Sequence, residues 1–272
     1  MSEQLNTWER MELIHNKTRP TVNDYIPMIF DEFYELHGDR CFGDDPAILG
    51  GIGKFSGIPV TVIGEVKGRD LEENRKANFG CPHPEGYRKA LRLAKQAEKF
   101  HRPVICFIDT PGAFCGVAAE ERGQGEAIAR NLFEFSRLKT PVISIVLGEG
   151  GSGGALALGV CDSLAMLQNA VYSVISPRGC ASILWKDASR EKEAAERLHI
   201  TAEDLVRFGV CDAIIPEPPG GAHTDPRLTA ENIADYILET LRKIQQKGVA
   251  NLLEARYNKF RKIGDFEEIP GI

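Results

Sequence analysis

Two apolar runs, residues 104–108 and 142–147, the second broken only by Ser144, constrain the fold of this chain more than any other feature. Each run has the length of a strand, and each is followed by glycine-containing sequence and then by a helical pattern of apolar residues. Strands without polar alternation are buried on both faces, as in parallel sheets that carry helices on each side. The two runs therefore predict an α/β fold built from strand–turn–helix units.

Other elements are expected around this sheet. A helix is predicted from Thr21 to a stop at Gly38, with Thr21 and Asp24 forming a capping box. A hairpin is predicted at 47–55 and 59–63, around a turn at Ser56 and Gly57. Further helices are expected at 85–100, 120–138, 153–160, 180–198, 201–208, 229–246 and 252–263, and strands at 164–167 and 171–175. We expect one domain over residues 1–272: a helical arm at 1–40, a core at 41–220 and C-terminal helices at 221–272.

Composition and charge argue against several classes of function. The formal net charge is −6, which disfavours a nucleic-acid-binding surface spread over the chain. No apolar run approaches the roughly 18–20 residues of a membrane span, and the first ten residues lack the apolar core of a signal peptide. The seven cysteines contain no Cys-x-x-Cys pair, so neither a disulfide framework nor a metal site is expected. A reducing compartment, the cytoplasm, is the expected location.

The densest local signal is Gly148-Glu-Gly-Gly-Ser-Gly-Gly-Ala155, which lies between the second apolar run and a helix. A glycine-rich turn from strand to helix leaves backbone N–H groups free at a helix N-terminus, where they attract negative charge. Such a turn suits a phosphate, or an oxyanion that develops during a reaction. No Gly-Lys-Ser/Thr ends the turn, so it is not a P-loop. In the alternative interpretation, the glycines only let the helix pack closely on the sheet.

The same segment also matches the Gly-x-Ser-x-Gly pattern of a hydrolase nucleophile, with Ser152 at its centre. In the chain order of that fold, Asp187, Asp204 or Asp212 would be the acid and His199 or His223 the base. Any stretch this rich in glycine matches the pattern easily. A serine hydrolase is nevertheless the main alternative function.

A second glycine-containing segment follows the first apolar run, from Asp109 to Gly116, and leads to Glu120-Glu-Arg-Gly-Gln-Gly125. Ligand sites of open α/β sheets lie at the carboxyl ends of the strands, where this segment is expected. Arg122 is the candidate to bind an anionic group, because its planar guanidinium matches a carboxylate. The alternative for Arg122 is a surface ion pair with Glu120 or Glu121.

Other polar residues give weaker signals. Arg88, Arg92, Lys95 and Lys99 form a stripe on one helix, which we expect to be a solvated face rather than a contact for cofactor phosphates. The six histidines have no metal-ligand spacing. Cys115 stands in the second glycine-containing segment, but nothing places a base beside it.

Several long motifs, in order over nearly the full length, make the chain resemble the alpha subunit of bacterial acetyl-coenzyme A carboxylase carboxyltransferase. The matching stretches are 32–40, 43–51, 78–92, 107–112, 119–124, 148–156, 172–177, 179–186, 215–218 and 220–223. The resemblance implies a crotonase-like (ClpP/crotonase) fold, in which ββα units wind into a superhelix with flanking terminal helices.

The resemblance also implies a reaction and its partners. The family transfers a carboxyl group from carboxybiotin, carried on a separate protein, to acetyl-CoA, and so makes malonyl-CoA for fatty-acid synthesis. It works with a zinc-ribbon beta subunit, commonly as an α₂β₂ assembly, and with the biotin carboxyl carrier protein and biotin carboxylase. Neither a nucleic acid nor a membrane is an expected partner.

Site residues follow from the same resemblance. Gly153 and Gly154 would donate their N–H groups to the biotin oxygen, and Arg122 would orient the carboxylate. Glycines expected to line the substrate site are Gly112, Gly116, Gly150 and Gly151. The chain departs from the usual family pattern at Phe114-Cys115, where Tyr-Pro is common, and at Arg178, where Glu is common.

Overall fold

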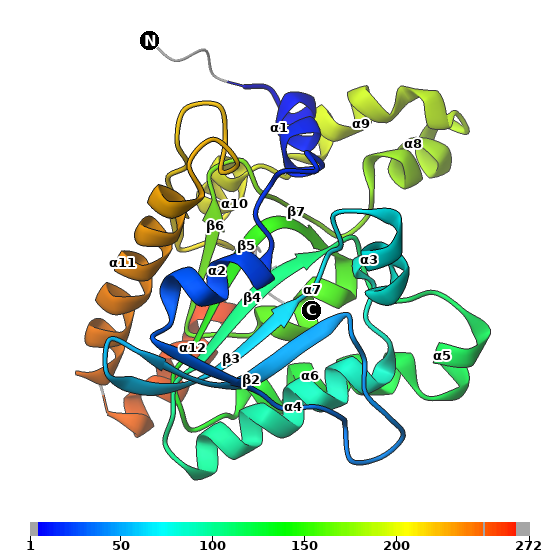
Figure 1. Cartoon of the computed structure of the whole chain (residues 1–272). Coiled ribbons are helices and arrows are strands. Elements are labelled where there is room, and N and C mark those ends of the chain that lie inside the picture. Colours follow the sequence, from blue (N-terminus) through cyan, green and yellow to red (C-terminus); the bar gives the residue numbers. More distant parts are fainter. Residues whose placement is uncertain (1–4, 247, 265–272) are drawn as a thin grey trace, which may run out of the picture.

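The computed structural model describes residues 5–246 and 248–264, and these are organised around one eight-stranded sheet (Figure 1). Its strands are β1 (Glu32–Glu35), β2 (Ile48–Phe55), β3 (Ile58–Glu65), β4 (Val104–Thr110), β5 (Val142–Gly151), β6 (Ser163–Leu167), β7 (Val171–Ser173) and β8 (Ala213–Ile215). The strand order is β1-β2-β3-β4-β5-β6-β8, and β7 pairs with the end of β5. Pairing is antiparallel from β1 to β3 and parallel from β3 onward. The carboxyl ends of β3, β4 and β5 therefore lie side by side.

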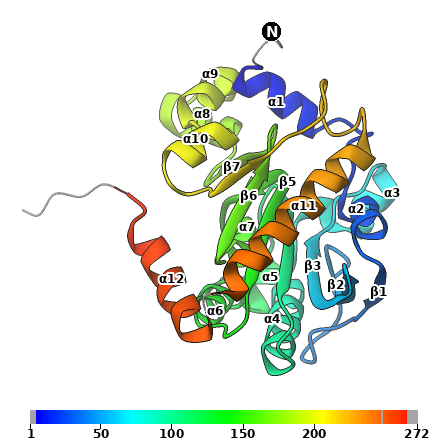
Figure 2. The ribbon, with the colours of Figure 1, turned by 90° about the vertical axis from the view of Figure 1, so that its left-hand side faces the viewer.

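Helices cover both faces of the sheet. They are α1 (Thr7–Ile14), α2 (Val22–Ile29), α3 (Leu71–Lys76), α4 (Pro84–Lys99), α5 (Val117–Glu121), α6 (Gln124–Ser136), α7 (Ser152–Gly159), α8 (Pro177–Trp185), α9 (Glu191–Leu198), α10 (Ala202–Arg207), α11 (Pro226–Gln245) and α12 (Val249–Arg261). Helices α2 and α11 pack together on one face, and Figure 2 shows α11 crossing in front of the strands. Helices α4, α6 and α7 pack against one another on the opposite side.

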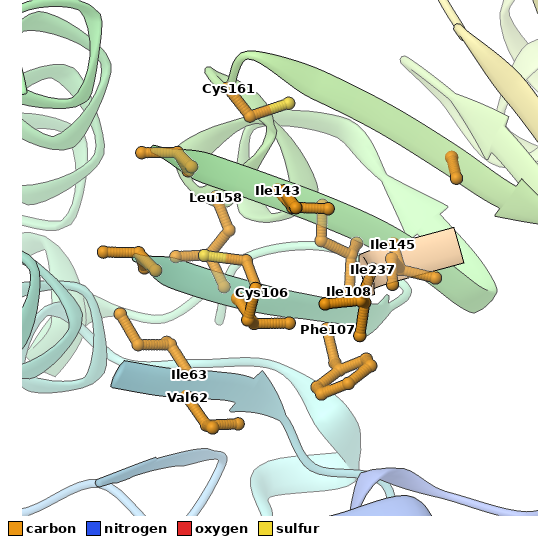
Figure 3. Close-up of a cluster of buried hydrophobic side chains, with 14 of the residues drawn as sticks. Val62, Ile63, Cys106, Phe107, Ile108, Ile143, Ile145, Leu158, Cys161 and Ile237 are labelled. Atoms are coloured by element: carbon orange, nitrogen blue, oxygen red, sulfur yellow. The ribbon is translucent and has the colours of Figure 1, made fainter. Parts of the chain in front are cut away.

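The core is the sheet between these two helix layers. Side chains of successive strand residues alternate between the faces, which is why residues 104–108 of β4 and nearly all of residues 142–147 of β5 are apolar. Figure 3 shows Leu158 of α7 beside Cys106, and Ile237 of α11 beside Ile145. All four side chains are fully buried. The prediction of a helix-covered α/β sheet is confirmed.

Two predicted helices are wrong in their extent. The helix that begins after Thr21 ends at Ile29, and β1 follows instead of a continuation to Gly38. The aromatic residues of β1 pair with residues of β2, and aromatic side chains favour strands as readily as helices. The predicted helix at 120–138 is two helices, because Gly123 takes the left-handed backbone conformation (φ 82°) between α5 and α6.

The helical region predicted at 180–198 is divided into α8 and α9 by a short 3₁₀ helix, Ala188–Arg190, and the other predicted elements occur with shifted ends. The predicted hairpin is formed by β2 and β3. The predicted capping box is also present, since the Asp24 carboxylate accepts a 2.8 Å hydrogen bond from the backbone N–H of Thr21. The predicted strand at 171–175 stops at Ser173. Helix α1 lies within the arm at 1–40 that was expected to be helical, whereas strand β8 and helix α3 were not predicted, since each is too short to show a period of its own.

Candidate active site

A tight turn joins β5 to α7 and lies against the loop that follows β4. A Cβ atom added to Gly151 would lie 2.1 Å from the carbonyl oxygen of Pro111, and one added to Gly154 would lie 2.7 Å from the amide nitrogen of Ala113. Side-chain atoms do not approach backbone this closely, so both positions require glycine. The close-packing interpretation therefore applies to Gly151 and Gly154.

Gly153 is different, because the space beside it is open. Its added Cβ would meet nothing closer than Ile128, at 3.7 Å, and the residue is half-buried. Within the described residues, no side chain caps the N-terminus of α7. The N–H groups of the first helical turn lack intrahelical partners, and the helix dipole adds partial positive charge at this end. The turn can therefore bind an anion or an oxyanion at Gly153.

Gly150, one residue before the turn, is also required for packing. Its added Cβ would lie 2.1 Å from the ring of Tyr172, which belongs to β7. Tyr172 pairs with Gly150 in the parallel β5–β7 ladder. The aromatic ring thus occupies the space beside Gly150, and the end of β5 is held between β4 and β7.

Ser152 is exposed and adopts a left-handed backbone conformation (φ 51°) at the first position of α7. A hydrolase would join its hydroxyl to a histidine. No hydrogen bond links Ser152 to an imidazole in the described part of the chain. His199 instead contacts Asp204 at 3.7 Å, and Asp204 caps helix α10. The remaining candidates make no hydrogen bond to Ser152 in the described region either. Asp187 caps a short helix, Asp212 binds Lys259, and the Nδ1 atom of His223 is buried without a partner there.

The loop after β4 brings Phe114 against the start of α4. The N–H of Phe114 donates to the carbonyl of Pro82, and its ring stacks on His83 at a centroid distance of 4.1 Å. Gly112 has φ 147°, and Gly116 is extended, with its added Cβ 2.8 Å from the Phe114 ring. These two predicted substrate-site glycines therefore shape the loop on which Gly154 packs.

Arg122 ends helix α5, and its side chain points to the start of α4 rather than to its neighbours. Its Nε donates to Glu85 Oε1 at 2.6 Å, and its Nη1 donates to the carbonyl of Ala118 at 2.8 Å. Its Nη2 lies 3.3 Å from His83 Nδ1, and the guanidinium carbon lies 4.6 Å above the Phe42 ring. The predicted alternative of a surface pair with Glu120 or Glu121 is therefore wrong.

A second polar cluster stands at the carboxyl ends of three parallel strands, and the sequence analysis did not find it. Lys67 Nζ lies 3.0 Å from Asp109 Oδ1 and 2.9 Å from Glu149 Oε2. Asp109 Oδ1 also accepts from the backbone N–H of Glu149, and Glu65 Oε2 accepts from that of Asp109. The cluster ties the end of β4 to the strand residues just before the glycine turn.

The electrostatics of this cluster follow from burial and the central ammonium group. Burial raises the pKa of Glu65 well above its usual value. Burial also acts to raise the pKa of Glu149, but the charge of Lys67 and the hydrogen bond with His15 outweigh it and lower the pKa to about 2. The pKa of Lys67 is raised, because the charges of Asp109 and Glu149 exceed the effect of burial. A cavity of about 440 Å³ opens beside these groups and is also lined by Pro111.

Sequence comparisons match the chain to one family over nearly its whole length. The family model described as acetyl co-enzyme A carboxylase carboxyltransferase-like matches residues 1–264. The acetyl-coenzyme A carboxylase carboxyl transferase subunit alpha of Clostridium acetobutylicum is 58% identical over 267 residues, which are 98% of this chain and 97% of the relative. The corresponding subunit of a Clostridium botulinum strain is 61% identical over 260 residues, 96% of this chain and 95% of the relative. The chain belongs to the acetyl-CoA carboxylase carboxyltransferase alpha-subunit family.

Solved structures of a transcarboxylase and of a malonate decarboxylase share the fold of this alpha-subunit family member. Transcarboxylase 12S aligns with a TM-score of 0.66 at 18% identity, over 98% of this chain and 47% of that one. This chain thus spans about half the length of that protein. The MdcD–MdcE heterodimer of Pseudomonas malonate decarboxylase aligns with a TM-score of 0.59 at 20% identity, over 78% of this chain and 84% of that one. The predicted crotonase-like fold is confirmed, and the comparisons give no support to the serine hydrolase.

The basic stripe on α4 of this carboxyltransferase subunit is not the solvated face that the sequence predicted. Arg88 binds the buried carboxylate of Asp39, and Arg92 donates to the carbonyl groups of Gly38 and His37. Lys95 pairs with Glu134. The stripe therefore binds the loop at 37–43 and helix α6 to α4. Of its four residues, only Lys99 is exposed.

Three further observations concern metals, thiols and membranes. No group of three or more potential metal-ligating side chains is gathered in the part of the chain that the structure describes. All seven cysteines lie in that part and are free thiols, with Cys41 and Cys115 exposed. Among the described residues, no helix has both the length and the apolar character that crossing a membrane requires.

Proposed function

We propose that this chain transfers a carboxyl group from carboxybiotin, carried on a separate protein, to acetyl-CoA, giving malonyl-CoA. The observation that carries the proposal is the near-complete match to named alpha subunits, combined with an uncapped glycine turn at the N-terminus of α7. In the reaction, the bond between the carboxyl carbon and the biotin nitrogen breaks, and a new bond forms to the acetyl methyl carbon. The methyl proton passes to the biotin nitrogen, so atoms and charge balance.

The turn would stabilise the charge that develops on the biotin oxygen. Gly153 and Gly154 are proposed as the donors, and Gly153 has the open space that a ligand needs to lie against backbone. A preorganised N–H donor of this kind contributes roughly 2.7–4 kcal/mol to a transition state. Gly150, Gly151, Gly112 and Gly116 would shape the surrounding site rather than donate.

Arg122 is proposed to orient the carboxyl group that is transferred. A guanidinium carries five N–H bonds, and three of them are directed to Glu85, Ala118 and His83. This leaves one N–H on each terminal nitrogen for a carboxylate, a pair that suits two-pronged binding. The side chain is about one-quarter exposed, so a ligand can reach it.

The proposal includes partners and a location. A beta subunit with a zinc ribbon would supply the site for the thioester, as an α₂β₂ assembly served by the biotin carboxyl carrier protein and biotin carboxylase. This chain itself would bind no metal. Seven free thiols are typical of a reducing compartment, so we infer that the protein works in the cytoplasm, where malonyl-CoA feeds fatty-acid synthesis.

Reconstitution tests the proposal. The purified chain, the beta subunit encoded in the same genome, and their mixture are each supplied with carboxylated carrier protein and acetyl-CoA. We expect malonyl-CoA from the mixture and none from either chain alone, because one subunit supplies only part of the site. Malonyl-CoA formation by this chain alone would contradict the divided site, and an inactive mixture of correctly assembled subunits would contradict the function.

A further inference from the structure

Glu85 is a buried acid next to the proposed carboxylate-binding arginine. It is the second residue of α4, after Pro84, and its side chain is only 4% exposed. Its Oε1 accepts from Arg122 Nε at 2.6 Å, whereas its Oε2 is buried and has no partner among the described residues. Glu85 lies in the first turn of α4, where the helix dipole adds partial positive charge.

Two residues of α4 bind Arg122, one at its side chain and the other at its backbone. Glu85 binds the side chain, and Arg88, one helical turn later, donates from Nη1 to the backbone carbonyl of Arg122 at 3.0 Å. Arg88 is itself fixed by Asp39, whose side chain is fully buried, at 2.7 Å. The position of Arg122 is therefore determined by α4, although the two segments are far apart in sequence.

The remaining contacts limit how the guanidinium can turn. A guanidinium only donates hydrogen bonds, so His83 Nδ1 is the acceptor of the 3.3 Å contact with Nη2. The Phe42 ring covers one face of the guanidinium plane. With Nε on Glu85, rotation about the end of the side chain would break the 2.6 Å ion pair.

Stability alone does not account for this arrangement. An ion pair with a buried partner gains little over apolar packing of the same volume, because the Glu85 carboxylate loses its hydration. The pair also leaves one carboxylate oxygen without a partner in the described structure, a further cost. What the pair does provide is a fixed orientation for the two N–H bonds that face no described residue.

We propose that Glu85 is a positioning residue for carboxyl transfer, holding Arg122 so that its terminal N–H bonds meet the anionic carboxyl group. This inference rests on the proposed function. Glu85 does not touch the substrate, and it acts only through Arg122. The consequence is that removing Glu85 lowers the rate of transfer by misaligning Arg122, not by weakening the binding of the carrier protein.

A double-mutant cycle in the reconstituted enzyme tests this inference. Glu85→Gln keeps the size of the side chain and removes its charge. We expect kcat to fall about tenfold to hundredfold, since misplacement by about 1 Å has effects of that size, while KM for the carboxylated carrier stays within about twofold. The double variant Glu85→Gln/Arg122→Lys should be no slower than Arg122→Lys alone, because Glu85 acts through Arg122.

Controls separate positioning from folding and from the proposed function. Glu121→Gln removes an exposed acid one residue from Arg122 and should leave kcat unchanged. Thermal unfolding confirms that each variant is folded. If Glu85→Gln does not assemble, Glu85→Asp retains the buried charge, loses one methylene, and should still lower kcat. The inference is overturned if kcat is unchanged in whichever of these two variants assembles. It is also overturned if the losses of the two single substitutions multiply in the double variant. An inactive wild-type mixture would instead overturn the proposed function.

Discussion

Substitution at Gly153 distinguishes catalysis by backbone N–H groups from simple packing. An added Cβ at Gly153 has 3.7 Å to its nearest neighbour, whereas one at Gly154 would lie 2.7 Å from backbone. Gly153→Val should therefore fold and assemble with the beta subunit, with a melting temperature within a few degrees of wild type. Gly154→Val should fail in stability and assembly together, because α7 cannot move off the loop after β4.

The expected loss of activity in Gly153→Val can be given a size. A branched side chain beside the N–H blocks the close approach of a ligand to the backbone. Loss of one oxyanion donor corresponds to about 10²–10³ in rate. Malonyl-CoA formation by the reconstituted enzyme, measured at matched assembly, should fall at least a hundredfold. Gly153→Ala adds only the Cβ and should fall between wild type and the valine variant.

Ser152 provides the matched control. Its hydroxyl makes no hydrogen bond in the described structure. In Ser152→Ala the residue still carries a Cβ, and its backbone takes the same left-handed conformation. The alanine variant should therefore keep wild-type stability and most carboxyltransferase activity. If Ser152→Ala is the inactive variant, or if Gly153→Val retains full activity, catalysis by the backbone of this turn is refuted.

Two further predictions concern Arg122 and Glu149. Arg122→Lys keeps the charge but loses the planar fork, so kcat should fall about a hundredfold while fold and assembly persist; near-normal kinetics would make Arg122 a purely structural partner of Glu85. Glu149→Gln removes a carboxylate whose pKa burial would raise but Lys67 and His15 together lower from 4.5 to about 2. These contacts therefore contribute stability that is fully present above pH 4.5 and is lost as pH falls toward 2. At pH 7 the variant should be less stable than wild type by on the order of 3 kcal/mol, and denaturant unfolding at a series of pH values should show this difference narrowing below pH 4.5; a difference independent of pH would contradict the assignment.

The sequence predicted the parts of this fold that depend on local pattern. The apolar runs became β4 and β5, and the glycine turn is located where those strands end. The break between α5 and α6 could not be predicted from periodicity, because the apolar spacing continues across it. It depends on one backbone angle at Gly123, which the sequence permits without requiring.

The partners of the candidate site residues were beyond the reach of local pattern. Arg122 has acidic neighbours in sequence, yet it pairs with Glu85, 37 residues away. The direction of its side chain depends on how α4 and α5 pack together, and this packing cannot be predicted from a single sequence. For the Lys67 cluster a signal did exist: Glu65, Asp109 and Glu149 each lie at or near the end of an apolar strand. Parallel pairing brings such ends together, so the three acids could have been predicted to meet.

The Lys67 cluster and the contacts between α4 and Arg122 together explain how a site made mostly of glycine is held rigid. Glycine contributes no side chain that could fix a loop, so the turn at Gly151 depends on what lies next to it. Lys67 joins the ends of β4 and β5 on one side of that turn. At the start of α4, Glu85 and Arg88 fix Arg122, and the loop after β4 donates from Phe114 to the segment just before α4. These charged side chains are therefore bound within the fold, and the loop after β4, on which the glycine turn packs, is held next to α4.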